Sequence, residues 1–382
     1  MFARRIARRF GHAALTACLL LPLAGHAGPY SALYVFGDSL SDGGSDLALS
    51  TALRQATGGA FPLVPGAPAD YQGRFSNGRV GVDYLATALG LPLTAHYVTP
   101  PFLGGVTGGN NYAQGGATSG TANASVPGTL NLGPTTVSTG FNGMSAQVAD
   151  YLAVAHVADP NAAYVVWAGA NDFLTFGSAG VAPGCSGSAI AVTICTAITN
   201  ITSAVATLAS LGAHHIVVPN LPDLGATARA IAGGPASIAQ GHAISVAFNA
   251  GLATSLSGLS ALYPGEILPF DLYSAFNDVL ANPAAYGFTN TTMACLSGSA
   301  ADATSTITAA CAAAGPNQYV YWDDIHPTTA THAIIGQRLA AVLGVPEPAD
   351  AALFAIGLVG LGAARGRRRR QSLPALGTNA AQ

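Results

Sequence analysis

The sequence predicts an α/β domain in which helices cover both faces of a mainly parallel central sheet, a three-layer α/β/α arrangement. Apolar runs rich in β-branched and aromatic residues recur along the chain, which is typical of buried strands. Longer segments with apolar residues at helical spacing separate these runs, and such alternation favours parallel strands. The chain has 382 residues, of which 50% are hydrophobic and 8% charged, so it is long and apolar enough to bury a core.

The first predicted elements are a strand and two helices. Residues 32–36 form an apolar run that stops at a glycine, which predicts a buried strand. A glycine- and proline-rich loop follows as far as residue 70, with a short helix predicted over residues 47–57. The pair Asn77-Gly78 is a turn signal, and apolar residues at helical spacing between residues 80 and 89 predict the second helix.

The rest of the body repeats this pattern. Residues 121–141 are low in complexity, and we expect a surface loop or lid there. Residues 162–168 are an apolar run that ends at a glycine, which predicts another buried strand. The remaining elements are predicted in the order helix, strand, helix, strand and helix, over residues 189–211, 215–219, 237–262, 266–270 and 331–343.

Polar residues directly follow three of the apolar runs. These pairs are Asp38 and Ser39, Asn171 and Asp172, and Asp323 and His326. In open α/β sheets, ligands bind at the carboxyl ends of the strands. Glycine, aspartate and serine are also the usual residues of ordinary turns, so each pair alone is weak evidence. The three pairs together favour a functional site at the strand ends, in which we expect Asp172 to be a supporting group.

These residues suit nucleophilic catalysis by a serine. A serine hydroxyl becomes a strong nucleophile when a base takes its proton and a third group orients that base. Ser39 is the candidate nucleophile and His326 the candidate base, and the three-residue spacing allows Asp323 to lie in the same turn and orient the imidazole. The oxyanion formed on attack needs hydrogen-bond donors, and the candidates are the backbone N–H groups of Ser39 and Gly116 and the amide of Asn171.

Four blocks, in this order along the chain, resemble the GDSL (SGNH) family of serine esterases and lipases. Gly37-Asp38-Ser39-Leu40 resembles the nucleophile block of this family, and Asn111–Ala117 resembles the block with the oxyanion glycine. Gly169-Ala170-Asn171-Asp172 resembles its asparagine block, and Asp323-Asp324-Ile325-His326 its closing Asp-x-x-His block. Further likeness extends the resemblance over about residues 34–343.

The resemblance implies a three-layer, flavodoxin-like fold and hydrolysis of carboxylic esters without a cofactor. It assigns the oxyanion glycine to Gly116 by the distance from Asn111, with Gly115 as an alternative. Asp324 is the alternative to Asp323 as the orienting acid, although the spacing favours Asp323. Two other functions remain open: an acyltransferase, in which an alcohol replaces water, and an inactive surface or matrix protein on the same scaffold.

The charge of the chain argues against a nucleic-acid partner. There is no lysine, and residues 28–345 contain five arginines against 15 carboxylates, a formal charge of −10. Nucleic-acid binding needs clustered cations. The chain also lacks a phosphate loop, a dinucleotide fingerprint and the cysteine spacing of a metal site, so we expect neither a cofactor nor a metal. The expected partner is a small-molecule, lipid or polysaccharide ester.

The first 27 residues are predicted to be a signal peptide. A basic segment, Arg4–Arg9, precedes an apolar one, Ala13–Leu23, and small residues follow near a cleavage site at Ala27. Export would place the four remaining cysteines in an oxidising compartment. Their close spacing suggests two local disulfides, although the two other connectivities remain open; the suggested pairs are Cys185–Cys195 and Cys295–Cys311.

The C-terminal region is predicted to be a second targeting segment. Pro346-Glu347-Pro348 is followed by 14 uncharged, mostly apolar residues and then by an arginine cluster. Fourteen helical residues rise about 21 Å, which is short of the roughly 30 Å hydrocarbon core. This order of features resembles the PEP-CTERM sorting signal of Gram-negative bacteria, which implies transient membrane contact and processing by an exosortase; a plain C-terminal anchor is the alternative.

We therefore expect four regions along the chain. They are a signal peptide (1–27), a hydrolase body (28–344), a sorting segment (345–370) and a short polar tail (371–382). The expected location is outside the cytoplasm of a Gram-negative bacterium, at the cell surface, in the outer membrane or in the medium.

Overall fold

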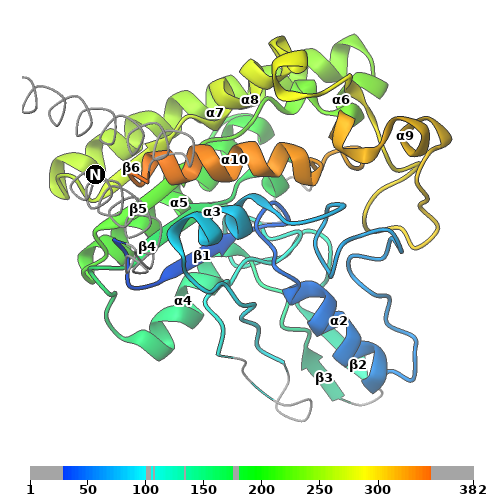
Figure 1. The fold of residues 1–382 in the computed structure, drawn as a ribbon. Coiled ribbons are helices and arrows are strands. Elements are labelled where there is room, and N and C mark those ends of the chain that lie inside the picture. The colour runs from blue at the N-terminus through cyan, green and yellow to red at the C-terminus, as the bar shows by residue number, and fades with distance from the viewer. Residues whose placement is uncertain (1–28, 100–104, 106–107, 133–134, 175–179, 346–382) are drawn as a thin grey trace, which may run out of the picture.

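The computed structural model describes residues 29–345, apart from 100–104, 106–107, 133–134 and 175–179. Its central sheet has four strands in the order β1–β4–β5–β6, formed by Leu33–Gly37, Ala163–Trp167, His215–Pro219 and Ile267–Phe270. Every neighbouring pair of these strands is parallel. The predicted fold class, an α/β domain with a mainly parallel central sheet, is therefore confirmed (Figure 1).

Helices cover both faces of this sheet, because successive strand residues point to opposite faces and each face needs a cover. In β1, Phe36 packs into one core and Val35 into the other. The first core is shared with α4 (Met144–Ala155), α5 (Ala189–Ser210) and α7 (Pro235–Leu262). The second is shared with α3 (Gly81–Leu89), α8 (Leu272–Ala281) and α10 (Thr329–Val342). By length and composition alone α5 and α7 could cross a membrane, but here they pack against the sheet.

Two further pairs of strands lie outside the central sheet. Residues 121–141, predicted as a loop or lid, contain the antiparallel strands β2 (Thr129–Leu132) and β3 (Thr135–Ser138). The threonines and valine of β3 favour a strand. The segment was predicted as a loop because glycines, serines and prolines surround these residues. The second pair, β7 (Asn290–Ala294) and β8 (Tyr319–Tyr321), is parallel.

The shorter elements gather at one end of the molecule. Figure 1 shows α2 (Ser45–Ala56), β2 and β3 at this end, with α6 (Ala228–Ala232) and α9 (Ala309–Ala314) above them. Leu49 and Leu53 of α2 pack with Phe75 and Phe141 into a small separate core.

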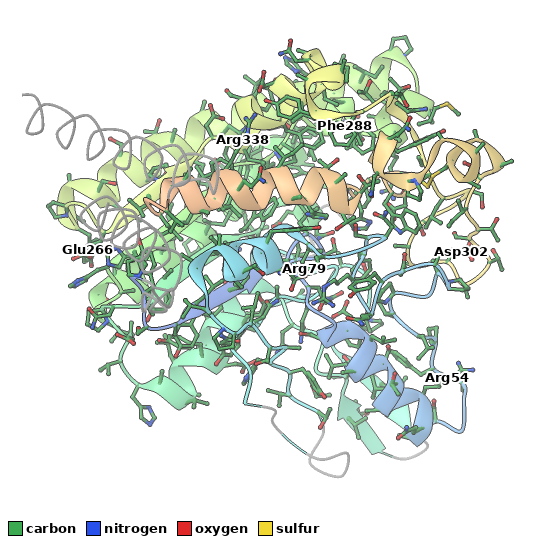
Figure 2. All side chains as sticks on the ribbon, in the orientation of Figure 1. Arg54, Arg79, Glu266, Phe288, Asp302 and Arg338 are labelled. Carbon is green, nitrogen blue, oxygen red and sulfur yellow. A yellow bond between two sulfur atoms is a disulfide. The ribbon has the colours of Figure 1, made fainter. Side chains whose placement is uncertain are left out.

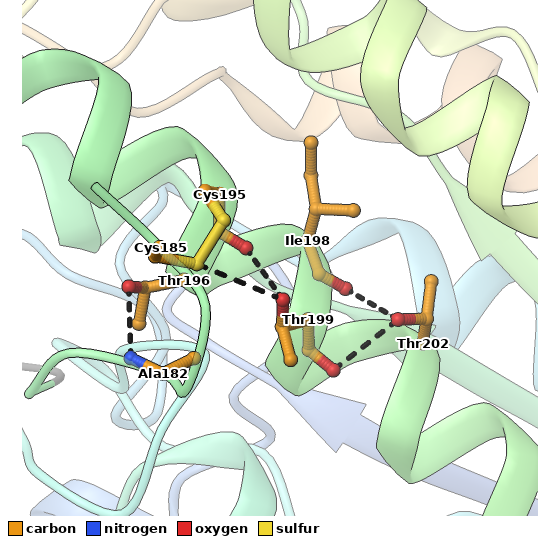
Figure 3. Close-up of a disulfide and its surroundings, with 7 residues drawn as sticks. All are labelled: Ala182, Cys185, Cys195, Thr196, Ile198, Thr199 and Thr202. Carbon is orange, nitrogen blue, oxygen red and sulfur yellow. Dashed lines mark hydrogen bonds between the residues drawn. A yellow bond between two sulfur atoms is a disulfide. The ribbon is translucent and has the colours of Figure 1, made fainter. Parts of the chain in front are cut away.

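The cysteines pair as predicted. The disulfides are Cys185–Cys195, shown in Figure 3, and Cys295–Cys311. The first disulfide ties the segment before α5 to that helix, and beside it the Ala182 N–H donates to the Thr196 hydroxyl. The predicted signal peptide, the sorting segment beyond residue 345 and the polar tail lie outside the described residues, so these regions stay predictions.

Candidate active site

Two strands bring Ser39 and His326 together although they are 287 positions apart. Ser39 follows β1, whereas Asp323 and His326 follow β8. The Ser39 Oγ lies 2.8 Å from the His326 Nε2, and the His326 Nδ1 lies 2.7 Å from the Asp323 Oδ2. All three side chains are buried. A hydroxyl, an imidazole and a carboxylate thus form one hydrogen-bonded chain, which is the geometry in which a base can take a serine proton.

The carboxylate of Asp323 fixes the turn that contains His326. Its Oδ1 accepts the N–H groups of Ile325 at 2.9 Å and His326 at 2.6 Å, a local pattern that aspartate favours in turns. Its Oδ2 accepts the N–H of Ala300 at 2.7 Å. The neighbouring acid Asp324, the alternative in the sequence, instead pairs with Arg229 at 2.6 Å. The three-residue spacing therefore sets Asp323 beside the imidazole.

The charges of Asp323 and His326 stabilise one another. Burial alone would raise the pKa of Asp323, but the charge of His326 and the hydrogen bonds hold this pKa below its ordinary value. Burial would lower the pKa of His326, yet the charge and hydrogen bond of Asp323 raise it above its ordinary value. The pair therefore favours an ionised Asp323 and an imidazole that is a stronger base than a free histidine.

The two glycines proposed for the oxyanion site differ in their contacts. The N–H of Gly115 donates to the Asp42 Oδ2 at 3.2 Å, and a Cβ on Gly115 would lie 2.2 Å from the Phe75 ring. Phe75 in turn packs against the imidazole of His326, with 5.2 Å between the ring centres. Gly116 has a φ of 76°, a conformation that favours glycine. Gly115 thus serves packing, and Gly116 remains the better candidate donor.

Asn171 follows β4, and both Asn171 and Ser39 line the same cavity. Its Nδ2 donates to the Ala117 carbonyl at 3.1 Å, which ties it to the residue after Gly116. The next residue, Asp172, accepts both the N–H and the hydroxyl of Ser119. The asparagine block and the glycine block are therefore held together by hydrogen bonds between them.

Buried carboxylates support the elements around the site. Burial raises the pKa of three of them to about 6: Asp38, Asp42 and Asp172. Asp42 accepts the N–H groups of Gly44 and Ser45, each at 2.7 Å, at the start of α2. Together with its bond to Gly115, this contact connects α2 to the glycine block. Asp42 thus caps the start of α2, and Asp172 acts as the supporting group that the sequence favours.

A cavity of about 240 Å³ opens beside Ser39. Its lining includes the exposed side chain of Leu174 and the buried side chains of Leu272, Phe276 and Ile335. The other apolar side chains of its wall are Leu40, Trp167, Ala170, Phe173, Pro222, Leu224, Ala230, Ile244, Ile325 and Pro327. Polar side chains, among them Asp223, Arg229 and Gln240, complete the lining. Because most of the wall is apolar, it suits a hydrocarbon group.

A serine, a histidine and an aspartate aligned at the strand ends of an α/β/α domain, next to an apolar cavity, are the features of a serine hydrolase. The GDSL-like Lipase/Acylhydrolase family matches residues 33–339, and the chain belongs to this family.

Named relatives agree on the type of reaction. A GDSL esterase/lipase of Arabidopsis thaliana is 32% identical over 344 residues, which cover 83% of this chain and 86% of the relative. Acetylajmalan esterase 2 of Rauvolfia serpentina is 26% identical over 336 residues, with coverage of 81% and 90%. The esterase EstA of Pseudomonas aeruginosa is 30% identical over 365 residues, which cover 86% of this chain and 49% of the relative. The protein is therefore a carboxylic ester hydrolase of the GDSL esterase/lipase family.

Proposed function

We propose that the protein hydrolyses esters through an acyl-enzyme on Ser39. The observation that carries this proposal is the 2.8 Å contact between the Ser39 Oγ and the His326 Nε2. His326 takes the hydroxyl proton as Oγ attacks the ester carbonyl, and then gives that proton to the departing alcohol. Water next attacks the acyl-enzyme with His326 again as base, which releases the acid and restores Ser39.

Asp323 and three donors support these steps in our proposal. Asp323 accepts the Nδ1–H of His326, so the Nε2 lone pair faces the serine, and its charge stabilises the imidazolium that forms. The N–H groups of Ser39 and Gly116 and the amide of Asn171 stabilise the oxyanion. Asn171 lines the same cavity as Ser39, which favours this role.

A fluorophosphonate probe tests the proposed nucleophile. We expect one probe per protein molecule, attached to the peptide that contains Ser39, with loss of p-nitrophenyl acetate turnover in proportion to labelling. Peptide mass spectrometry and the rate assay measure the two quantities on the same sample. Labelling of another residue, or full turnover by the labelled protein, would refute the assignment.

The activity is expected to fall in acid as His326 becomes protonated. The base must be neutral, and its pKa lies above the ordinary histidine value of about 6.5. The value of kcat/KM should therefore reach its plateau at higher pH. Its logarithm should decline with unit slope as the pH falls below this raised pKa. A pH profile with a p-nitrophenyl ester measures the midpoint, and a midpoint below 6.5 contradicts the expected coupling to Asp323.

We propose that the apolar cavity receives the acyl chain of the ester. Its volume of about 240 Å³ and its mostly apolar lining suit an acyl chain of several carbons. Each buried methylene adds at most about 0.8 kcal/mol, so kcat/KM should rise up to about fourfold per carbon and decline once the cavity is full. A p-nitrophenyl ester series from acetyl to palmitoyl measures this optimum.

Phe276→Leu should move the optimum towards longer acyl chains, because Phe276 is a large buried side chain of the cavity wall and leucine leaves more room there. The rate with the acetyl ester is expected to stay close to wild type, since a two-carbon group does not need the added space. Val154→Ala, at an exposed position on α4, is the control substitution. An unchanged chain-length profile for Phe276→Leu would place the acyl group elsewhere.

We also propose that the protein is exported and then sorted through its C-terminal segment by an exosortase-type enzyme in a Gram-negative bacterium. The two disulfides favour an oxidising compartment. The intact mass of the protein from its native cells tests both steps. We expect an N-terminus near Gly28 and loss of the arginine cluster; a full-length chain in the cytoplasm would contradict the proposal.

A further inference from the structure

The loop closed by the disulfide Cys295–Cys311 reaches from the surface to the candidate active site. Its two arms are paired, because the Ser297 N–H donates to the Thr306 carbonyl at 2.8 Å. Its tip is a tight turn, in which the Asp302 N–H donates to the Ser299 carbonyl at 3.0 Å. Figure 1 shows this segment next to α9, and Figure 2 labels Asp302 at the edge of the molecule.

One amide of this turn contacts the buried acid. The N–H of Ala300 donates to the Asp323 Oδ2 at 2.7 Å, and the same oxygen accepts from the His326 Nδ1. The two other donors to Asp323, the N–H groups of Ile325 and His326, belong to the local turn and bind Oδ1. Ala300 is thus the donor that reaches the carboxylate from another part of the chain.

We propose that the Cys295–Cys311 loop is a positioning element of the active site, which holds the Asp323 carboxylate against His326 through the N–H of Ala300. This inference rests on the proposed roles of Asp323 and His326. A carboxylate can rotate about its Cβ–Cγ bond, and the local turn restrains Oδ1 alone. The bond from Ala300 restrains Oδ2, so an Oδ2 lone pair stays directed at Nδ1.

The loop is anchored at its first arm and at its tip. Its first arm runs beside the strand before the acid, with the Leu296 N–H donating to the Trp322 carbonyl at 2.7 Å. Its tip is held by a second loop, since the Ala300 carbonyl accepts the N–H groups of Gly66 and Ala67, each at 2.9 Å. The disulfide connects the second arm, which ends at Cys311, to the anchored first arm at Cys295. The loop therefore presents the Ala300 amide in one fixed position.

The Ala300 amide should affect the chemical step rather than substrate binding. Ala300 is fully buried behind the acid, and the residues that line the cavity belong to other segments. Loss of a hydrogen bond to a buried charged group costs about 1–3 kcal/mol, which corresponds to about 5- to 150-fold in kcat. The bond between Asp323 and the His326 Nδ1–H should weaken at the same time.

Two variants displace the loop tip in different ways. Cys295→Ala/Cys311→Ala releases the second arm. Gly66→Ala keeps the disulfide but brings a methyl group to 2.7 Å from the Ala301 carbonyl, which pushes the tip away. The matched controls are Cys185→Ala/Cys195→Ala, which removes the other disulfide, and Gly128→Ala, where a methyl group meets open space.

Steady-state kinetics and proton NMR test the proposal on the full-length protein. We expect both tip variants to lower kcat about 5- to 150-fold, with KM within about twofold, and to shift or broaden the downfield resonance of the His326 Nδ1–H. Both controls should keep the wild-type resonance and kcat. The proposal is overturned if folded tip variants keep the wild-type kcat and resonance, or if the control disulfide variant loses the resonance equally.

The experiment also gives an answer if one variant misfolds or if the proposed nucleophile is wrong. If the Cys295→Ala/Cys311→Ala variant fails to fold, the Gly66→Ala variant with both disulfides intact decides the question. If Ser39 proves not to be the nucleophile, the proposed function fails and the kinetic comparison no longer tests the loop. The His326 Nδ1–H resonance still reports whether the loop positions Asp323.

Discussion

A Ser39→Ala variant is expected to lose about 10⁵- to 10⁶-fold in kcat for p-nitrophenyl esters, with little change in KM. The loss is large because the hydroxyl bonded to the His326 Nε2 forms the acyl-enzyme, and water must otherwise attack the ester directly. KM is preserved because the apolar wall of the cavity is untouched. Initial rates corrected for active protein give both constants.

His326→Ala should cost about as much as Ser39→Ala, and the double variant should be no slower than either single variant. Ser39 and His326 act in the same step, so once one of them is lost, removal of the other causes no further loss of rate. Ser41→Ala is the matched control: Ser41 is equally buried in the same turn, but its hydroxyl has no hydrogen-bond partner among the described residues. A Ser39→Ala variant that keeps wild-type turnover would end the acyl-enzyme proposal.

The sequence locates the side chains of this site well, because each lies in a local pattern. Ser39 follows an apolar run that ends at a glycine, and Asp323 and His326 share one turn, so strand ends and spacing suffice to bring them together. The choice between Gly115 and Gly116 depends on which N–H is free to face the site. That choice needs the contact from Gly115 to Asp42, which spacing does not reveal.

Groups that act through the backbone or through packing leave no such pattern. The donor at Ala300 is a main-chain N–H, so residue type carries no signal for it. Its position depends on pairing of the loop with Trp322 and on contact with Gly66, which are distant in the sequence. Phe75 lies against His326 because Gly115 leaves room for its ring. Both contacts are products of tertiary packing.

The same contrast applies to the fold. The long helices α5 and α7 match the predicted ranges within about two residues, because each is a long, mostly apolar segment with no proline after its first residue. The helices α4, α6, α8 and α9 were not predicted. Short helices are marginal by themselves and are stabilised mainly by the faces that they bury. In α8, for example, Leu272 and Phe276 pack against the body of the protein, and this contact exists only in the folded chain.

Asp323→Asn is expected to lower kcat about 10⁴-fold although asparagine has nearly the same shape. In the wild type, Oδ1 faces two backbone N–H groups, and Oδ2 faces the N–H of Ala300 and the Nδ1–H of His326. The amide NH₂ of asparagine must replace one of these oxygens. Placing the NH₂ group at the Oδ2 position is less unfavourable, because there it faces one backbone N–H donor instead of two.

An NH₂ group at the Oδ2 position would donate to the Nδ1 of His326 and select the imidazole tautomer with its proton on Nε2. That nitrogen would then donate to the Ser39 hydroxyl instead of accepting its proton, so the base is lost without a change of fold. The pKa of His326 should fall as well, because burial lowers it and the charge of Asp323 no longer raises it. The acid limb of kcat/KM should therefore move to lower pH, which a pH profile measures.

Asp324→Asn provides the matched comparison, because it changes the adjacent carboxylate in the same way. Asp324 pairs with the partly exposed Arg229, and loss of such a pair costs about 0–1 kcal/mol of stability. Its kcat should therefore stay within a few-fold of wild type. A severe loss in Asp324→Asn together with normal turnover in Asp323→Asn would instead assign the orienting carboxylate to Asp324.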